Sequence, residues 1–309
     1  MNKKQLKYRI ELLKKFITHP KSFVIFLASK GIIEYDDKYY IAYIFEEKFN
    51  KEINLDNPQT FNEKLQWLKL YDRKEIYTTM VDKYKVKKYV ANIIGEEYII
   101  PTLGIYDKFE DINFDKLPNQ FVIKCTHDSG GLIIVKDKFK IDIESAKKKI
   151  NKCLKRNYFY KYREWPYKNI KPRIIVEKYI KDELIEDLRD YKFMCFNGEV
   201  KYVYVTVKND DIFENYYDLD FNPVMINHGF RRYEKEFKKP ENFEIMVEIA
   251  KKLSKNVPFL RVDLHNVKGK IYFGEMTFYD WGGLRTFPDE KIDIELGKLI
   301  DVGLVKNEK

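Results

Sequence analysis

Apolar residues recur at helical spacing through the first third of the chain. Residues 61–70 and 77–94 each place their apolar side chains on one face of a helix, and Gly95 follows the second run as a C-terminal cap. The pattern predicts a mainly helical region over residues 1–95.

Beyond Gly95 the pattern changes to that of strands. It predicts strands at residues 98–103, 121–126 and 132–135, followed by a lysine-rich helix at residues 144–156. Strand, hairpin and helix in this order are typical of a small α+β subdomain, which we assign to residues 96–176.

A second group of strands begins at residues 173–180 and continues at 191–196 and 200–207. The pair Asn197-Gly198 between the last two is a strong signal for a two-residue hairpin turn. Residues 241–255 then have the spacing of an amphipathic helix, and a final hairpin covers residues 259–278. We assign this second α+β part to residues 177–309. The helix positions expected to face inward are Phe243, Met246, Val247, Ala250 and Leu253.

The final hairpin, FLRVDLHNVKGKIYFGEMTF, carries acidic and basic groups close together. Residues two apart share one face of a strand, so Arg261 lies beside Asp263, and Glu275 beside Thr277. The two carboxylates face the same side only if the connecting loop holds an odd number of residues, and a three-residue turn at 268–270 meets that demand. Neighbouring carboxylates repel unless a cation lies between them, and hard oxygen ligands suit Mg²⁺ with nucleotide phosphate completing its shell. A solvated charged face on an amphipathic hairpin is an equal alternative.

The chain has 309 residues, long enough for a sizeable core, with 58 basic and 49 acidic residues and a formal charge of +9. This balance favours anionic partners. Lysine, isoleucine, asparagine and tyrosine are abundant throughout, so part of the basicity reflects compositional bias, which disfavours a nucleic acid as the partner.

Cysteine usage and hydropathy bear on location. Three widely spaced cysteines, at positions 125, 153 and 195, fit neither a disulfide framework nor a zinc site, so we expect a reducing cytoplasm. No run approaches the ~18 apolar residues that a membrane helix needs. Residues 3–17 place Leu6, Ile10, Leu13 and Ile17 on one helical face among lysines, which is compatible with peripheral contact with an anionic membrane at its inner face or with packing on the domain.

Two further segments carry candidate chemistry. Lys124 lies on a strand that leads into the turn from His127 to Gly131, where backbone N–H groups could lie over phosphates, although an ordinary hairpin turn explains the segment as well. Glu177-Lys178 ends one strand, and Asp190 and Lys192 open the next. A strand end can hydrogen-bond an adenine edge, while surface salt bridges are the alternative for such adjacent charges.

These features, taken in order, resemble the ATP-grasp superfamily, and the wording of the segments resembles its TupA-like branch, named for teichuronopeptide biosynthesis. The resemblance runs from about Phe61 to Thr277. The matching stretches are FNEKLQWLKLYDR, VDKYKVKKYV, LPNQFVIKCTHDSGG, YKNIKPRIIVEKYI, DYKFMCFNG and RVDLHNVKGKIYFGEMTF.

The resemblance implies an α+β ATP-grasp fold, in which two α+β subdomains clamp ATP and its magnesium ions, here preceded by a mainly helical region in place of the usual first α/β subdomain. It also implies residue roles. ATP phosphates would be contacted by Lys83 and Lys124, under a loop of His127, Asp128, Ser129, Gly130 and Gly131, and by Lys192, aided by Asp190. The adenine hinge would be formed by Glu177, Lys178, Tyr179 and Ile180. Mg²⁺ would be bound by Asp263, Glu275 and Thr277, and the transferring phosphoryl group would be acted on by Arg261 together with Lys124 and Lys192. Many relatives carry Asn where this chain has Thr277.

The segment after the hairpin adds aromatic rings, glycines and a guanidinium. Trp281, Gly282, Gly283 and Arg285 suit a sugar, and Arg285 could clamp a carboxylate. A structural loop capped by a buried tryptophan is an equal alternative.

The function implied by the resemblance is that of an ATP-grasp ligase that forms an amide through an acyl phosphate. It would join an amine or amino acid to a uronic acid or other acidic acceptor in the biosynthesis of a bacterial surface polysaccharide such as a capsule. A glycosyltransferase of the same biosynthesis, and a non-catalytic glycan- or nucleotide-binding module, are the alternatives.

Overall fold

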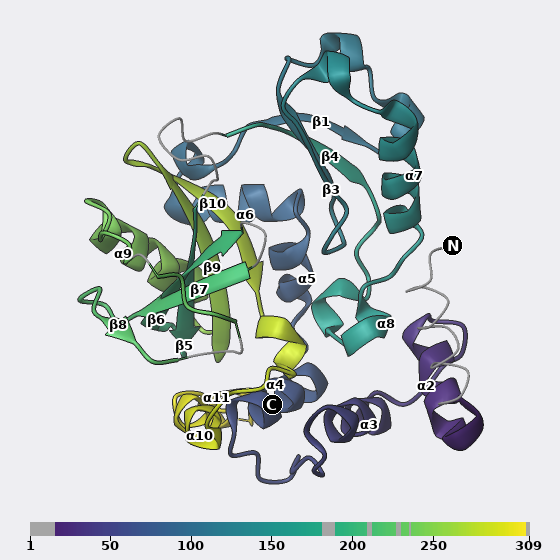
Figure 1. The fold of residues 1–309 in the computed structure, drawn as a ribbon, viewed down its shortest axis with the longest axis vertical. Coiled ribbons are helices and arrows are strands. Elements are labelled where there is room, and N and C mark those ends of the chain that lie inside the picture. The colour runs from purple at the N-terminus through teal and green to yellow at the C-terminus, as the bar shows by residue number, and fades with distance from the viewer. Residues whose placement is uncertain (1–15, 181–188, 209–211, 227–229, 235, 307–309) are drawn as a thin grey trace.

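The computed structural model describes residues 16–180, 189–208, 212–226, 230–234 and 236–306 (Figure 1). The amphipathic pattern predicted at residues 3–17 lies almost entirely outside these ranges. Among the described helices, none combines the length and apolar character needed to cross a bilayer.

Helices form the first part of the described chain, as predicted: α2 (Pro20–Ser29), α3 (Asp37–Phe49), α4 (Phe61–Tyr71), α5 (Glu75–Val81) and α6 (Lys85–Ile94). The single helix predicted over residues 77–94 is wrong. Asp82 interrupts it, because its carboxylate accepts hydrogen bonds from the backbone N–H groups of Tyr84 and Lys85 and so offers the chain a new helix start. Gly95 ends α6 with φ of +111°, a backbone conformation that favours glycine.

The smaller sheet has four antiparallel strands in the order β1 (Thr102–Tyr106), β4 (Ile174–Lys178), β2 (Phe121–Cys125) and β3 (Leu132–Val135). Helix α7 (Ile143–Leu154) packs on one face of this sheet, and Ile150 joins Phe121 and Val176 in its core. The first strand begins later than predicted. Residues 96–98 form a 3₁₀ turn, and Pro101, which has no N–H to give a ladder, precedes the strand.

The larger sheet has six antiparallel strands in the order β10 (Lys270–Thr277), β9 (Phe259–Val267), β5 (Asp190–Phe196), β6 (Glu199–Lys208), β7 (Ile212–Tyr217) and β8 (Pro223–Val224). The predicted turn between β5 and β6 is confirmed, with Asn197 and Gly198 both at positive φ. Helix α9 (Phe243–Ser254) covers this sheet, and all five of its predicted inward residues are buried. Strands β7 and β8 and the helices α10 (Glu290–Lys298) and α11 (Gly303–Lys306) had not been predicted.

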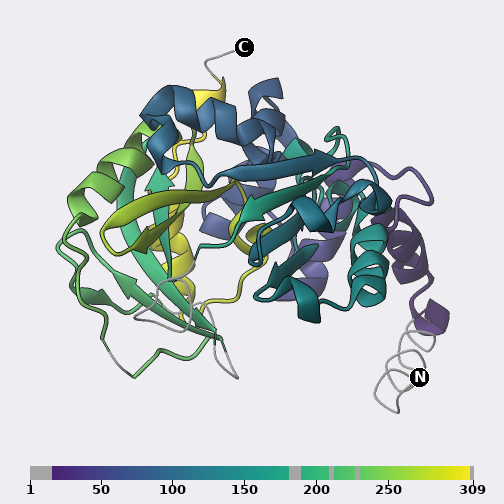
Figure 2. The same ribbon diagram turned by 90° about the horizontal axis from the view of Figure 1, so that it is seen from above.

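The described residues form two large hydrophobic cores and a small third one, in which Ile25 and Ala28 of α2 pack with Tyr40 of α3. Helices α4 to α6 share one large core with the larger sheet, α9 and α10, while the smaller sheet and α7 form the other. Figure 2 shows α9 and α7 on opposite outer sides, so the inner faces of the two sheets are turned toward each other. The boundary expected between residues 176 and 177 falls inside β4. The three cysteines are buried free thiols.

The turn of the final hairpin differs from the prediction. Val267 pairs with Lys270, so the loop holds only two residues, Lys268 and Gly269, both at positive φ. An even loop alone would place Glu275 opposite Val262, on the wrong face.

A β-bulge at Gly274 restores the correct face. The register shifts between Phe273 and Glu275, and Glu275 pairs with Asp263. A bulge inserts one extra residue into one strand, so every residue of that strand beyond the bulge pairs one position away from the partner that a regular ladder would give it. Gly274 fits because a Cβ there would lie 2.9 Å from the carbonyl oxygen of Asp263. The two carboxylates therefore share a face through the bulge rather than through an odd loop.

Replacing Gly274 by alanine should destabilise the hairpin. The new methyl group would meet the Asp263 carbonyl, and we expect a loss of about 1–3 kcal/mol in the free energy of unfolding, as for other overpacked sites. Urea denaturation measures the loss. Gly303→Ala is the matched control, since its Cβ would meet only the movable side chain of Asp301. Equal stability of the two variants would show that the close approach at Gly274 is not required.

Candidate functional site

Four polar side chains lie on one face of the β9–β10 hairpin. Glu275 is paired with Asp263 and Thr277 with Arg261, and directly paired residues point to the same side of a sheet. The prediction that these four residues share a face is confirmed.

Arg261 is the centre of this face. Its guanidinium donates two parallel hydrogen bonds to Asp263, from Nε to Oδ1 (2.7 Å) and from Nη2 to Oδ2 (2.8 Å). Nη2 also reaches Oε1 of Glu275 at 3.3 Å, and Nη1 donates to Oδ1 of Asp280 at 2.6 Å and to the Tyr204 hydroxyl at 3.3 Å. Arg261 is 9% exposed. The planar guanidinium thus joins carboxylates from three segments that would otherwise repel one another.

Two lysines approach the same carboxylates. Lys192 Nζ on β5 lies 2.7 Å from Asp263 Oδ2 and 3.3 Å from Asp190 Oδ2, and Lys83 Nζ lies 3.4 Å from Glu275 Oε2. Burial disfavours the charged form of Lys192, but Asp263 and Asp190 outweigh it and raise the pKa of this lysine. Partial burial likewise opposes the charge on Glu275, yet Lys83 and Arg261 hold the pKa of its carboxyl well below the ordinary value. Both groups are therefore ionised at neutral pH.

A second ionic cluster lies on the smaller sheet. Glu177 on β4 accepts hydrogen bonds from Lys124 on β2, at 2.7 Å, and from Lys87 on α6. The Glu177 carboxylate is buried, but the two lysines overcome the effect of burial and lower its pKa. The surface salt bridge between Glu177 and its neighbour Lys178, given above as an alternative, is not formed among the described residues, and the ion pairs of Glu177 are with lysines of other elements.

The two clusters are joined through a backbone contact. The N–H of Lys83 donates to the carbonyl of Thr126 at 3.0 Å, where β2 runs into the loop predicted to cover phosphates. Within this loop the His127 ring lies in the packing against α7, with Nε2 3.2 Å from the Cys153 carbonyl, and Asp128 pairs with Arg156. Ser129 and Gly130 are exposed, whereas Gly131 is buried. Only the tip of the predicted loop is therefore open to a ligand.

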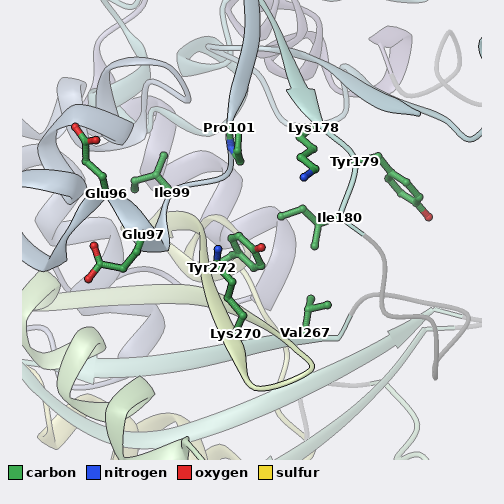
Figure 3. Close-up of a pocket in the computed structure, with 10 residues that line it drawn as sticks. All are labelled: Glu96, Glu97, Ile99, Pro101, Lys178, Tyr179, Ile180, Val267, Lys270 and Tyr272. Carbon is green, nitrogen blue, oxygen red and sulfur yellow. The ribbon is translucent and has the colours of Figure 1, made fainter. Parts of the chain in front are cut away.

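A cavity of about 390 Å³ lies between the end of β4 and the tip of the β9–β10 hairpin (Figure 3). Lys178, Tyr179 and Ile180 form one wall, and Val267, Lys270 and Tyr272 form the wall opposite. Glu96, Glu97, Ile99 and Pro101 complete the lining. Three of the four residues predicted as a hinge thus border a space with mixed apolar and polar walls.

The segment after β10 has a left-handed backbone. Trp281, Gly282 and Gly283 follow one another at φ of +51°, +66° and +62°, in the 3₁₀ turn η6 (Asp280–Gly283). Trp281 is 47% exposed, so it is not the buried cap of the structural alternative. Arg285 is buried instead: its guanidinium lies 4.4 Å from the centre of the Trp281 ring, and Nη2 donates to Glu214 at 2.6 Å. A carboxylate ligand would have to compete with Glu214 for this arginine.

The hairpin has a donor set that suits Mg²⁺. Asp263 and Glu275 offer carboxylate oxygens on one face, and the Thr277 hydroxyl lies two residues further along β10. In the part of the chain that the structure describes, no group of three or more His, Cys, Asp or Glu side chains is arranged to hold a metal. One or two carboxylates with water or phosphate oxygens are an ordinary shell for Mg²⁺.

Sequence reasoning missed three residues of the site: Lys87, Asp280 and Tyr204. Lys87 lies in the segment predicted to be helical, but its contact with Glu177 on β4 comes from the tertiary fold. Asp280 stands beside the predicted Trp281, but its contact with Arg261 depends on the backbone of η6. Tyr204 lies on β6, away from Arg261 in sequence, and no local signal marks it.

Comparison with known proteins gives one family. The family described as TupA-like ATP-grasp matches residues 63–301. No curated protein matches the chain. Similar solved structures include D-alanine-D-alanine ligase from Bacillus anthracis in complex with ATP (19% identity over 75% of this chain and 68% of that chain, TM-score 0.41), an ADP complex of N5-carboxyaminoimidazole ribonucleotide synthetase (16%, 79% and 57%, 0.45), and biotin carboxylase from Campylobacter jejuni (13%, 77% and 52%, 0.43).

Glu177 should make the folded state sensitive to acid. Its pKa is lowered on folding, so its stabilising effect is fully present above its unfolded pKa of about 4.3 and is lost as pH falls through the lower, folded value. At pH 7 we expect Glu177→Gln to cost roughly 3 kcal/mol, because it leaves two lysines without their buried counter-charge. Urea denaturation at about half-unit steps from pH 7 down to pH 3 measures the free energy of unfolding of the variant and of the unsubstituted protein. The difference between the two should become smaller as the pH falls.

The exposed carboxylate of Glu110, paired with Lys147, provides the control. Glu110→Gln should leave the denaturation midpoint unchanged at neutral pH. A Glu177→Gln difference that stays constant over the whole pH range would contradict the assignment of this carboxylate as the ionised partner of the two lysines.

Proposed function

Because the chain belongs to the TupA-like ATP-grasp family and so has the ATP-grasp fold, we propose that it is an ATP-dependent carboxylate-amine ligase. Membership makes ligase chemistry driven by ATP the expected class of reaction. The finer proposal is an amide between an amine or amino acid and a uronic acid or other acidic group, formed during biosynthesis of a bacterial surface polysaccharide.

The arrangement around Arg261 supports this proposal most strongly. A buried guanidinium held in place by Asp263, Glu275 and Asp280 is a fixed positive charge, and Lys192 and Lys83 lie on either side of the same carboxylates. Phosphoryl transfer is catalysed almost entirely by positioning and by cations of this kind. A glycosyl transfer has no need of three converging cations beside paired carboxylates.

The nucleotide would lie between the two sheets. The base would occupy the cavity beside Lys178, Tyr179 and Ile180, where the backbone at the end of β4 can bond its edge. The phosphates would extend toward Lys124, Lys83 and Lys192, under the exposed backbone of Ser129 and Gly130. Mg²⁺ held by Asp263 and Glu275, with Thr277 nearby, would neutralise phosphate charge when bound.

The reaction has two steps. An acceptor carboxylate oxygen attacks the γ-phosphorus, the bond from this phosphorus to the β,γ-bridging oxygen breaks, and ADP leaves. The amine nitrogen then attacks the acyl carbon of the acyl phosphate, the carbon–oxygen bond to phosphate breaks, and nitrogen loses a proton. Arg261 would stabilise the charge on the transferring group in the first step. Neither step needs a protein nucleophile.

Trp281 supports a sugar-bearing acceptor. Its ring is half exposed and follows directly after Asp280, which contacts Arg261. An aromatic face at this point can pack against the apolar face of a sugar whose carboxylate reaches the phosphoryl group. Arg285, with its guanidinium against the Trp281 ring, would hold this ring in place, while Gly282 and Gly283 give the turn its shape.

Removing either metal-binding carboxylate should abolish turnover. We expect Asp263→Asn and Glu275→Gln to lower ADP release by roughly 100-fold or more, since even outer-shell partners of a metal are worth 10–100-fold. The assay measures Mg²⁺-dependent ADP release with a panel of uronic acids and amines supplied together. Circular dichroism checks that the variants are folded.

Two exposed carboxylates serve as controls. Asp107→Asn and Glu295→Gln remove surface ion pairs with Lys171 and Lys298 and should keep full turnover. Full activity in the Asp263 and Glu275 variants would remove the metal assignment. Sugar-nucleotide cleavage without any ATP turnover would favour a glycosyltransferase, and neither activity would favour a binding module.

Shortening Trp281 should weaken the acceptor alone. With glucuronate as the probe, Trp281→Ala is expected to raise the KM for the acceptor roughly 10-fold while the KM for ATP stays the same, as expected for loss of an aromatic contact. Trp281→Phe, which keeps a flat ring, should retain most of the affinity. A rise in the KM for ATP instead would place this ring at the nucleotide.

A further inference from the structure

Helix α4 buries polar side chains where an ordinary amphipathic helix would bury apolar ones. Asn62, Gln66 and Lys69 are spaced by four and three residues, so they lie along one face of the helix. All three are 0% exposed. Buried polar groups are costly unless they are hydrogen-bonded, so their partners explain why they are there.

Most of the partners are backbone groups of the segment after β10, and Asn62 also donates to Asp293 Oδ2 on α10 at 3.0 Å. Lys69 Nζ donates to the Gly282 carbonyl at 2.7 Å, and Gln66 Nε2 donates to the carbonyls of Gly282 (3.0 Å) and Gly283 (2.6 Å). Asn62 exchanges two hydrogen bonds with the backbone of Arg285, at 2.9 and 3.1 Å. Lys69 also donates to Gln66 Oε1, which links the row.

The segment that these residues grip has a strained backbone. Trp281 lies in the left-handed region, which costs a residue with a side chain roughly 1–2 kcal/mol and persists only where the surroundings enforce it. A Cβ at Gly283 would lie 2.6 Å from Gln66 Nε2, so there is no room for a side chain between the loop and the helix here. The bonds from α4 supply the enforcement.

The other end of the same turn holds the central arginine. Asp280, the residue before Trp281, accepts a hydrogen bond from Arg261 at 2.6 Å and one from the Tyr204 hydroxyl at 3.2 Å. Asp280 is 1% exposed. A short path therefore runs from α4 through the backbone of η6 to the guanidinium between the hairpin carboxylates.

We propose that Asn62, Gln66 and Lys69 form a clamp on residues 282–285, the end of η6 and the residues after it, that positions Asp280, and through it Arg261, for phosphoryl transfer. They are positioning residues: none of them touches the reacting groups. The structural part of this inference stands on the contacts alone, and its catalytic part rests on the proposed function. The helical region that precedes the two sheets is then part of the active site.

Lys69 is the residue of this row that is most costly to bury, because its ammonium group can carry a charge. Burial disfavours its ammonium group and lowers its pKa to about 7, and the buried carboxylate of Glu164 opposes this effect only in part. Charged or neutral, Nζ keeps hydrogens to donate to the Gly282 carbonyl and to Gln66 Oε1. These two hydrogen bonds, rather than the charge, are what Lys69 contributes to holding the strained loop.

Hydrogen exchange measures the clamp without any need for activity. In Gln66→Met and Lys69→Met we expect the backbone amides of residues 279–286 to exchange at least about 10-fold faster, because the loop loses the bonds that hold its backbone. Lys64→Met is the matched control: Lys64 also donates from α4 to a carbonyl, at 2.8 Å, but to that of Ile300. Gln66→Met leaves Lys69 and Glu164 in place, so it carries the test if Lys69→Met does not fold.

Turnover then tests the catalytic part. Gln66→Met should lower ADP release by roughly 10–100-fold with little change in ATP affinity, and in an Asp280→Asn background it should lower it no further, since Gln66 acts through Asp280. Lys64→Met should combine additively with Asp280→Asn. Unchanged exchange in residues 279–286 would overturn the clamp whatever the enzyme does. Faster exchange with additive losses of turnover would overturn its catalytic role. Absence of turnover in the unsubstituted protein would instead count against the proposed function.

Discussion

The buried guanidinium of Arg261 is the interaction on which the rest of the site depends. It is bonded to Asp263 on β9, Glu275 on β10 and Asp280 in η6. Taking an arginine out of water is costly, and only close carboxylates repay that cost. The carboxylates in turn would repel one another without it. Each feature that brings one of them within reach, including the bulge at Gly274 and the left-handed turn at Trp281, is therefore a condition for a stable hairpin face.

Lysines near both sheets are paired with carboxylates, as Arg261 is. Lys192 and Lys83 are paired with carboxylates of the larger sheet, and Lys124 and Lys87 with Glu177 of the smaller one. A triphosphate entering between the sheets could exchange partners with these pairs: the lysines would turn to phosphate, and Asp263 and Glu275 would be released to a metal. Such an exchange gives each of these lysines a new counter-charge, and Arg261 would keep its bond to Asp280. A buried charge without a partner is costly, so the exchange lowers the cost of binding a polyanion here.

Local sequence patterns predicted most of the fold. The Asn197-Gly198 turn, the inward face of α9 and the shared face of the final hairpin all follow from local spacing. The bulge at Gly274 did not, because counting by twos assumes a regular ladder, and one extra residue reverses the outcome. The break at Asp82 was missed because a side chain can compete with the helix for backbone N–H groups. Asp280 and Tyr204 could not be predicted at all, since their role comes from contacts with a residue on another strand.

The burial of Asn62, Gln66 and Lys69 on α4 could not be predicted from local sequence either. Asn62, Gln66 and Lys69 are polar, and on a helix with an apolar face the natural expectation is that they face water. Their burial becomes intelligible only with the carbonyls of Gly282 and Gly283, which lie more than 200 residues further along the chain. Polar residues at helical spacing can therefore mark a surface that grips backbone rather than one that meets solvent. In this protein that surface joins the helical region to a turn whose backbone is left-handed at three successive residues, 281–283, and so makes the two structurally interdependent.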